Sequence, residues 1–160
     1  KKSDKAPEVV MKLSELLSFM LYKSSVDTIT LQEEIRVLED YIELERIRYN
    51  ERLTVSFTKQ IDDPSQRIIP LLFLPLVENA FKHGIEPADT PGFLHLRLQS
   101  NARHLSFSCE NPAGEISGKK PGIGLDNLRR RLSLLYPGRY ELKTGKENHI
   151  FKAELYLDFT

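Results

Sequence analysis

Three polar side chains lie close together at the end of an apolar segment. In the stretch ENAFKHG (Glu78–Gly84), Asn79, Lys82 and His83 are spaced i, i+3 and i+4, so on a helix they project from one face. An amide oxygen suits Mg²⁺, which prefers oxygen ligands, and the ammonium group of Lys82 suits a phosphate oxygen. The pattern favours a metal-bound polyphosphate ligand. The alternative is an ordinary last helical turn, with Lys82 at the negative end of the dipole and Gly84 as a cap.

A second segment, PGIGL (Pro121–Leu125), carries two glycines before a helical pattern. The pattern has an apolar stripe formed by Leu125, Leu128, Leu132 and Leu135. Gly122 and Gly124 would let a phosphate approach bare N–H groups at a helix N-terminus, where the dipole favours an anion. A turn without a ligand is the alternative, because a lone GxG is a weak signal. The spacing fits neither GxGxxG after a parallel strand nor GxxxxGK[ST], which excludes Rossmann and P-loop sites.

Helical patterns open the chain. Apolar residues from Val9 to Leu21 fall at helical spacing, and a second helix is predicted from Leu31 to Tyr49. Thr30 and Glu33 have the form of a capping box at the start of that second helix. Its broad apolar face predicts packing on more than one side, either in a helical hairpin or in a dimer interface.

From Leu53 onward the period changes to two. Alternating segments predict strands at Leu53–Thr58, Leu94–Gln99, Leu105–Cys109, Tyr140–Lys143 and Phe151–Asp158. Two further helices are predicted between them, at Ile69–His83 and Ile123–Tyr136. Strands with one dry and one wet face are typical of an antiparallel sheet covered on one side. The sum is a two-layer α/β sandwich preceded by helices.

Composition narrows the class of protein. The 160 residues include 23 Lys and Arg against 23 Asp and Glu, and this zero net charge argues against a nucleic-acid partner. Cys109 is the sole cysteine, so an internal disulfide is excluded and a reducing compartment is favoured. The longest apolar stretch, Ile68 to Val77, is ten residues, half of the roughly 20 needed to span a bilayer. We expect the chain, which starts without Met, to be part of a longer protein.

Taken in order, the motifs resemble those of a known family. LVENAFKHG (Leu76–Gly84) resembles the N box, and GIGLDNLRRRLSLLY (Gly122–Tyr136) resembles the G2 box, of the GHKL superfamily of ATP-binding domains, which have the Bergerat fold. LQEEIRVLEDYIELERIR (Leu31–Arg48) and IPLLFLPLVENAFKHG (Ile69–Gly84) are similar to segments of LytS-like sensor histidine kinases. The resemblance extends from Leu13 to Phe159.

The resemblance implies an α+β fold with a mixed, mostly antiparallel sheet and helices on one face. Residues 1–50 would be the helical remnant of a dimerisation region, and residues 51–160 the ATP-binding catalytic domain. The implied ligands are ATP and Mg²⁺, with Asn79 on the metal and Lys82 on phosphate as the catalytic residues. Gly122 and Gly124 would lie in the hinge of a mobile lid. The implied nucleotide-binding set comprises Glu78, Asn79, Lys82, His83, Glu110, Asn111, Gly122, Ile123, Gly124 and Leu125.

The chain departs from the superfamily pattern at three points. The G1 box normally reads DxGxG, and its Asp accepts a hydrogen bond from the adenine amino group; here the stretch is ENPAG (Glu110–Gly114). Glu110 is the implied adenine ligand, with Asn111 as the next candidate. Pro75 stands where the ATPase branches place a water-activating Glu, which favours transfer over hydrolysis. The "NPHFLFN"-like box that carries the acceptor histidine is absent, and the four histidines present are expected to be structural or surface residues.

Together these features predict the ATP-binding catalytic domain of a two-component sensor histidine kinase. It would transfer the γ-phosphoryl group of ATP to a histidine outside this sequence. The parent kinase is expected to be a homodimer that relays the phosphoryl group to a response regulator. Its location would be the cytoplasmic side of a bacterial inner-membrane sensor, with membrane attachment only through upstream segments. The alternative is a catalytically degenerate nucleotide-sensing or dimer-scaffold module.

Overall fold

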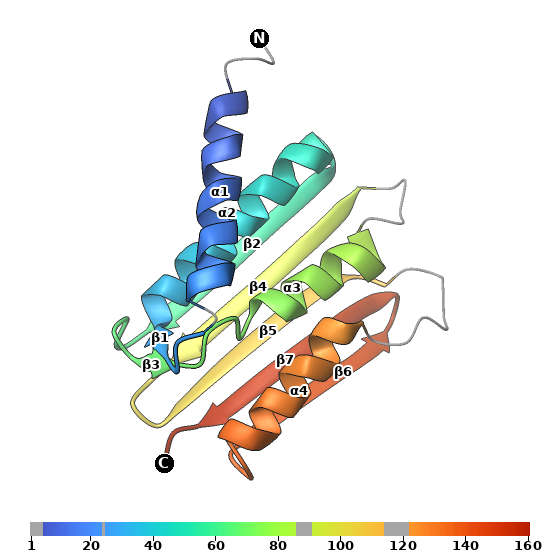
Figure 1. Cartoon of the computed structure of the whole chain (residues 1–160). Helices are drawn as coiled ribbons and strands as arrows, with labels where there is room; N and C mark the ends of the chain where they lie inside the picture. Colours follow the sequence, from blue (N-terminus) through green and yellow to red (C-terminus); the bar gives the residue numbers. More distant parts are fainter. Residues whose placement is uncertain (1–4, 24, 86–90, 114–121) are drawn as a thin grey trace. The chain divides into compact units, whose positions relative to one another are not determined.

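The computed structural model describes residues 5–23, 25–85, 91–113 and 122–160 (Figure 1). The chain packs as two units, one formed by Lys1–Asn50 with Pro64–Leu72 and the other by Glu51–Asp63 with Phe73–Thr160. The chain therefore passes between the units more than once. Among the described residues, no helix has both the length and the apolar character that a membrane crossing requires.

The first unit contains two helices and a small sheet. Helix α1 (Ala6–Tyr22) contacts α2 (Leu31–Tyr49), and strands β1 (Ile29–Thr30) and β3 (Arg67–Ile68) pair antiparallel. Both helices were predicted from the apolar spacing, whereas the two-residue strands are too short to leave a period in the sequence. Leu16 is the buried residue of α1, and Leu13, Leu17 and Leu21 of the predicted stripe remain exposed. A role of this stripe in dimerisation stays a prediction.

The capping box at the start of α2 is confirmed. The Glu33 carboxylate accepts a hydrogen bond from the Thr30 amide (2.9 Å), and the Thr30 hydroxyl accepts one from the Glu33 amide (3.1 Å). The hydrogen bond from the Thr30 amide, with a smaller contribution from the charge of Lys23, lowers the pKa of Glu33 from its ordinary value of 4.5. Two of the N–H groups that a helix start leaves without intrahelical partners are thereby satisfied.

Replacing Thr30 by Ala should lower the free energy of unfolding by roughly 0.5–2 kcal/mol, the usual cost of losing a cap. Because the folded-state pKa of Glu33 is depressed, the contribution of its carboxylate is present above pH 4.5 and is lost as the pH falls through the folded pKa. Urea unfolding at pH 7 and at pH 3 measures both effects. Thr58→Ala, on the exposed side of the second unit, is the control and should change stability by less than about 0.5 kcal/mol. An equal loss in both variants would contradict the capping role.

The second unit is built on a five-stranded sheet. Its strands are β2 (Leu53–Ile61), β4 (Gly92–Ser100), β5 (His104–Pro112), β6 (Tyr140–Glu147) and β7 (Ile150–Asp158), in the order β2-β4-β5-β7-β6. The pair β2–β4 is parallel and the other three pairs are antiparallel. Helices α3 (Leu74–Ala80) and α4 (Ile123–Leu135) both lie on one face of this sheet (Figure 1). The predicted two-layer α+β architecture is confirmed.

Alternation along the strands divides the sheet into a covered and an open face. On the covered face, buried residues pair across strands, as in Leu96 with Cys109 and Phe107 with Leu155. Phe73 stacks on Phe107 with ring centroids 4.5 Å apart. Burial raises the pKa of the Cys109 thiol to about 12, which leaves a neutral, unreactive core residue.

The predicted helix Ile69–His83 is wrong in its first and last parts. The α-helix begins at Leu74, with Pro75 in its first turn, where a missing N–H is tolerated. Before it, Leu71 adopts a left-handed φ of 56°, and Ile69, which precedes Pro70, is disfavoured in helical conformation. After Ala80 the chain forms a π-helical turn, η2 (Phe81–Ile85). The apolar run resembles one long helix in the sequence because its residues are apolar almost throughout, and the structure buries nearly all of them.

Two strands are longer than predicted. Strand β5 continues past Cys109 to Pro112, because β7 pairs with it over its whole length. Strand β6 continues to Glu147 and is joined to β7 by Asn148 and His149, which have φ values of 52° and 63°. Two consecutive positive φ values are typical of the type I′ hairpin turn. Turn geometry and strand pairing, not hydrophobic period, set these ends. A short 3₁₀ turn, η1 (Asn50–Arg52), precedes β2.

Candidate functional site

The predicted polar triad lies where α3 gives way to the π-helical turn η2. Asn79 is in the last turn of α3 and is 9% exposed, whereas Lys82 is exposed and His83 half-buried in η2. The i, i+3, i+4 spacing of these three residues was predicted for a regular α-helix, but the chain changes from α-helix to π-helix between Asn79 and Lys82. Glu78, half-buried, precedes Asn79. The apolar side chains around Asn79, among them Val77 and Ala80, are fully buried and hold this turn in the core.

Gly84 joins this turn closely to the end of β5. A Cβ atom placed on Gly84 would overlap the side-chain amide of Asn111 and the backbone carbonyl oxygen of Pro112. Glycine is therefore needed here for the close approach of two segments, and not as the helix C-cap, which is Phe81. The predicted N box and the end of β5 are in direct contact through this residue.

Asn111 lies at that contact on the covered face of the sheet. Its side chain is 1% exposed, and its Nδ2 atom donates a hydrogen bond to the carbonyl oxygen of Pro112 at 2.8 Å. Its Oδ1 atom is buried and has no hydrogen-bond partner within the part of the chain that the structure describes. A buried acceptor without a partner is costly, and each such group in a native protein calls for an explanation. A buried Oδ1 atom without a partner is expected where a ligand supplies the hydrogen-bond donor.

Glu110 lies on the opposite, open face of the sheet. It stands inside β5, where it pairs with His95 of β4 and Lys152 of β7, and its carboxylate is 3.6 Å from the Lys152 ammonium group. Successive side chains of a strand point to opposite faces, so Glu110 and Asn111 cannot both face the helices. Of the two predicted adenine ligands, Asn111 is the one beside Gly84. Gly114, the last residue of the degenerate G1 box, is outside the described residues.

The start of α4 carries the predicted glycine pair. Gly122 is the N-cap, and its carbonyl oxygen accepts hydrogen bonds from the amides of Leu125 (3.1 Å) and Asp126 (3.4 Å). Leu125 is buried in the core, whereas Ile123 is 80% exposed. A Cβ on Gly122 would meet no atom within 4 Å, and neither Gly122 nor Gly124 has a positive φ. Packing in the described part of the chain thus does not explain the glycine at position 122. Pro121, also part of this motif, is outside that part.

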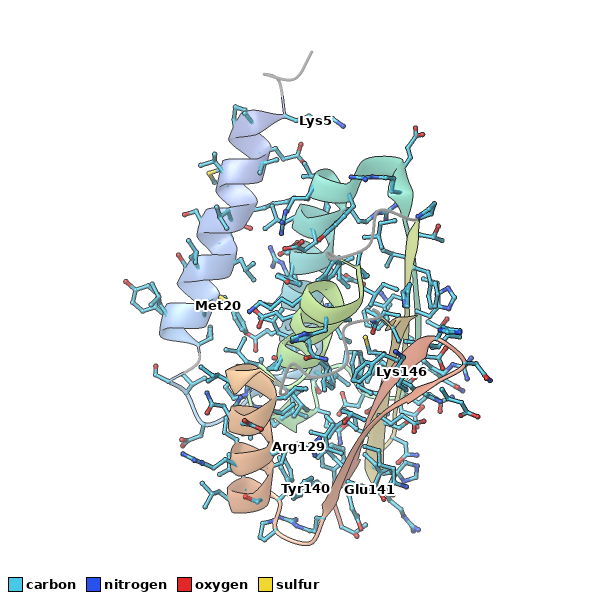
Figure 2. All side chains as sticks on the ribbon, turned by 90° about the vertical axis from the view of Figure 1, so that its right-hand side faces the viewer. Lys5, Met20, Arg129, Tyr140, Glu141 and Lys146 are labelled. Atoms are coloured by element: carbon cyan, nitrogen blue, oxygen red, sulfur yellow. The ribbon has the colours of Figure 1, made fainter. Side chains whose placement is uncertain are left out.

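Two contacts fix α4 within the second unit. A Cβ on Gly124 would lie 3.8 Å from the Cβ of Pro75, so the start of α4 is next to the start of α3. Arg129 reaches β6 and donates hydrogen bonds to the Leu142 carbonyl oxygen (3.3 Å) and the Thr144 hydroxyl (3.5 Å). Figure 2 shows Arg129 on the side of α4 that faces the sheet. This arginine anchors the helix, a role that its position one turn after the glycines did not reveal.

Two of the residues at this junction are only weakly indicated by the sequence. Gly84 is the last residue of the predicted N box and a helix cap in the alternative without a ligand, and Asn111 is only the next candidate after Glu110. The signal for Asn111 was present in the alternation of Leu105, Phe107 and Cys109, which continues to position 111 on the buried face. Nothing in the sequence could identify the overlap at Gly84, because it depends on the packing of η2 against β5.

Comparisons with known proteins agree on one class. A family model described as histidine kinase matches residues 1–53. The chain is 32% identical over 150 residues to the sensor histidine kinase YesM of Bacillus subtilis, covering 87% of this chain and 26% of that protein. It is 29% identical over 150 residues to the sensor protein LytS of Staphylococcus haemolyticus, covering 84% and 25%. The chain thus spans about a quarter of the length of these relatives.

A solved structure shows the same fold. The histidine kinase ThkA, in complex with the response regulator protein TrrA, superposes with a TM-score of 0.55 at 17% sequence identity. The match covers 96% of this chain and 49% of that chain. At this identity the likeness concerns the fold alone.

Proposed function

Because the chain belongs to the sensor histidine kinase family, we propose that it is the ATP-binding catalytic part of such a kinase. In this proposal it transfers the γ-phosphoryl group of ATP to a histidine that lies outside the sequence. The observation that carries the proposal is the junction of η2 with the end of β5. There Gly84 brings the turn that follows Asn79 against the side-chain amide nitrogen of Asn111, whose Oδ1 atom has no hydrogen-bond partner among the described residues.

Asn111 is the proposed adenine ligand. Its Nδ2 atom is held by the Pro112 carbonyl oxygen, so the amide cannot rotate freely and its Oδ1 atom remains an acceptor. The exocyclic amino group of adenine is a donor and would satisfy that atom. Guanine carries a carbonyl oxygen at the same position, which would set acceptor against acceptor. Glu110, occupied with Lys152 on the open face, has no part in this proposal.

The phosphates and the metal are assigned to residues near this junction. The amide oxygen of Asn79 is a suitable Mg²⁺ ligand, and the exposed ammonium group of Lys82 suits a phosphate oxygen. The amides at the start of α4 suit a second phosphate, since Gly122 and Gly124 leave that backbone open to approach. The residues present therefore fit Mg-ATP. When bound, Mg²⁺ would neutralise charge on the polyphosphate.

Phosphoryl transfer requires little covalent chemistry from the protein. The residues of this chain would mainly position the nucleotide and its phosphates. Pro75, in the first turn of α3, cannot act as a base that activates water. His104 stacks on Tyr156 and contacts Asn101, and His149 forms the β6–β7 turn, so neither has the surroundings of a phosphoacceptor. Both facts support transfer to an external histidine rather than hydrolysis.

The partners and location of the whole protein are part of the same proposal. ThkA is bound to a response regulator protein in its solved complex, and we assign a response regulator to this chain as well. The exposed stripe of α1 around Leu13, Leu17 and Leu21 is suited to a dimer of the parent kinase. The domain would work in the cytoplasm of a bacterium, attached to the inner membrane through segments outside this sequence.

Base discrimination tests the proposal. Wild-type protein should bind ADP at least about tenfold more tightly than GDP, since an unmatched buried acceptor costs roughly 1–3 kcal/mol and 1.4 kcal/mol is a factor of ten. Asn111→Leu, which removes the acceptor oxygen, should lose that preference. Isothermal titration of both proteins with both nucleotides gives the four affinities.

Glu110→Ala is the matched control, because it removes the neighbouring side chain on the other face of the same strand. Its ADP affinity should equal that of the wild type. If Glu110→Ala loses the preference for adenine and Asn111→Leu keeps it, the assignment of Asn111 is wrong. If wild-type protein binds neither nucleotide, the proposed function itself fails.

A further inference from the structure

Residues 64–72 are bound to the start of α2 by main-chain hydrogen bonds. The amide of Leu31 donates to the Gln66 carbonyl oxygen at 2.8 Å, and that of Gln32 to the Pro64 carbonyl oxygen at 3.0 Å. The first amides of a helix have no intrahelical partners, so these contacts complete the N-terminus of α2. Arg67 adds hydrogen bonds to the hydroxyl and carbonyl oxygens of Thr28. The segment is thus an integral part of the first unit.

A buried carboxylate holds the last two residues of that segment. Glu34, in the first turn of α2, is 2% exposed. One of its oxygens accepts a hydrogen bond from the Leu71 amide at 2.9 Å, and the other accepts one from the Leu72 amide at 2.5 Å. Hydrogen bonds to an ionised acceptor are about twice as strong as neutral ones. The carboxylate therefore binds two consecutive backbone amides with both of its oxygens.

The backbone at this point has an uncommon conformation. Leu71 has a φ of 56°, in the left-handed region that bulky residues rarely adopt. Such a conformation persists only where its surroundings require it. Consecutive amides that converge on an anion form a concave binding site of the kind called a nest, and here the anion is the side chain of Glu34. Glu34 is thus the side chain around which this conformation is built.

Leu71 and Leu72 lie where the chain passes from the first unit to the second. Leu72 is the last residue of the first unit, Phe73 is the first residue of this part of the second, and α3 begins at Leu74. Asn79 lies in that same short helix. The chain therefore runs from amides bound by Glu34 directly into the helix that carries the proposed metal ligand.

We propose that Glu34 is a positioning residue that couples the helical unit to the nucleotide site through the amides of Leu71 and Leu72. The inference rests on the proposed function, because it assumes that Asn79 belongs to a nucleotide site. A change in α2 acts on the chain entering α3 through these two hydrogen bonds. By reciprocity, nucleotide bound at the site must stabilise the same two hydrogen bonds by an equal factor.

Amide exchange and nucleotide affinity test this reciprocity together. In wild-type protein, saturating ADP should slow exchange of the Leu71 and Leu72 amides at least about fivefold, the lower end of typical coupling factors. Glu34→Gln, which keeps the size but can no longer accept both hydrogen bonds as an anion, should weaken ADP binding by about the same factor. The methods are NMR-detected hydrogen exchange and isothermal titration.

Glu33→Gln is the control, since Glu33 precedes Glu34 on α2 and binds Thr30 rather than residues 71 and 72. It should leave both the affinity and the ADP-induced slowing unchanged. The proposal is overturned if Glu33→Gln weakens ADP binding as much as Glu34→Gln does, or if Glu34→Gln binds ADP as the wild type does.

The exchange experiment on the wild-type protein tests the coupling even if Glu34→Gln does not fold. ADP that slows exchange around Asn79 but leaves Leu71 and Leu72 unchanged would refute the coupling. Absence of any ADP binding by the wild type is a different result, and it would refute the proposed function.

Discussion

Replacing Asn79 by Ala is expected to abolish the Mg²⁺-dependent part of the stabilisation by ATP. A ligand present at a hundred times its Kd stabilises the folded state by roughly 2.7 kcal/mol. For a chain of 160 residues this corresponds to a rise of about 5–10 °C in Tm. If the Asn79 amide oxygen binds the metal, the variant should show the same Tm with ATP alone as with ATP and Mg²⁺. Thermal unfolding with and without Mg²⁺ measures the difference.

Two further variants make this experiment specific. Asn79→Asp retains an oxygen ligand and should keep a Mg²⁺-dependent shift, which a general disturbance of α3 would remove. Gln60→Ala removes an exposed amide from β2, far along the chain from the proposed site, and should behave as wild type. An Asn79→Ala protein whose Mg²⁺-dependent shift equals that of the wild type would show that Asn79 is not the metal ligand.

Gly84→Ala is expected to damage both stability and nucleotide binding. The added methyl group would overlap the Asn111 amide and the Pro112 carbonyl oxygen, and the latter is backbone that no side-chain rotation can move away. Overpacking of this kind costs roughly 1–3 kcal/mol, and more where the backbone must shift. Displacing Asn111 should also weaken ADP binding at least about tenfold, as the loss of 1.4 kcal/mol would. Urea unfolding and isothermal titration measure the two effects.

Gly145→Ala provides the matched control for the same chemical change. Gly145 lies in β6, it has no positive φ, and a Cβ there would meet no atom within 4 Å. Stability should change by less than about 0.5 kcal/mol, with unaltered ADP affinity. Equal losses in the two variants would mean that the contact at Gly84 has no special role. Loss of stability in Gly84→Ala without loss of affinity would separate the packing contact from the proposed site.

The elements that could be predicted from the sequence are those whose buried face repeats at a regular period. Helix α2 shows its apolar stripe and its capping box, and β4 and β7 show strict alternation, so local patterns suffice to identify them. The resemblance of three ordered motifs also sufficed to identify the family, and the spacing of polar residues sufficed to select Asn79 as a candidate. Each of these inferences depends on residues that are neighbours along the chain. The apolar spacing, the alternation and the capping residues are all local features, so the sequence alone shows them.

The tertiary structure decided everything that depends on a distant partner. The segment before α3 is as apolar as a core helix, yet it is not helical, because Glu34 binds two of its amides and Leu71 turns left-handed there. Strand β5 extends far enough to include Asn111 because β7 pairs with it to the end. Gly84 is needed because η2 lies against that end. A hydrophobic period records which face of an element is buried, but not which residue of a distant element fills the space beside it.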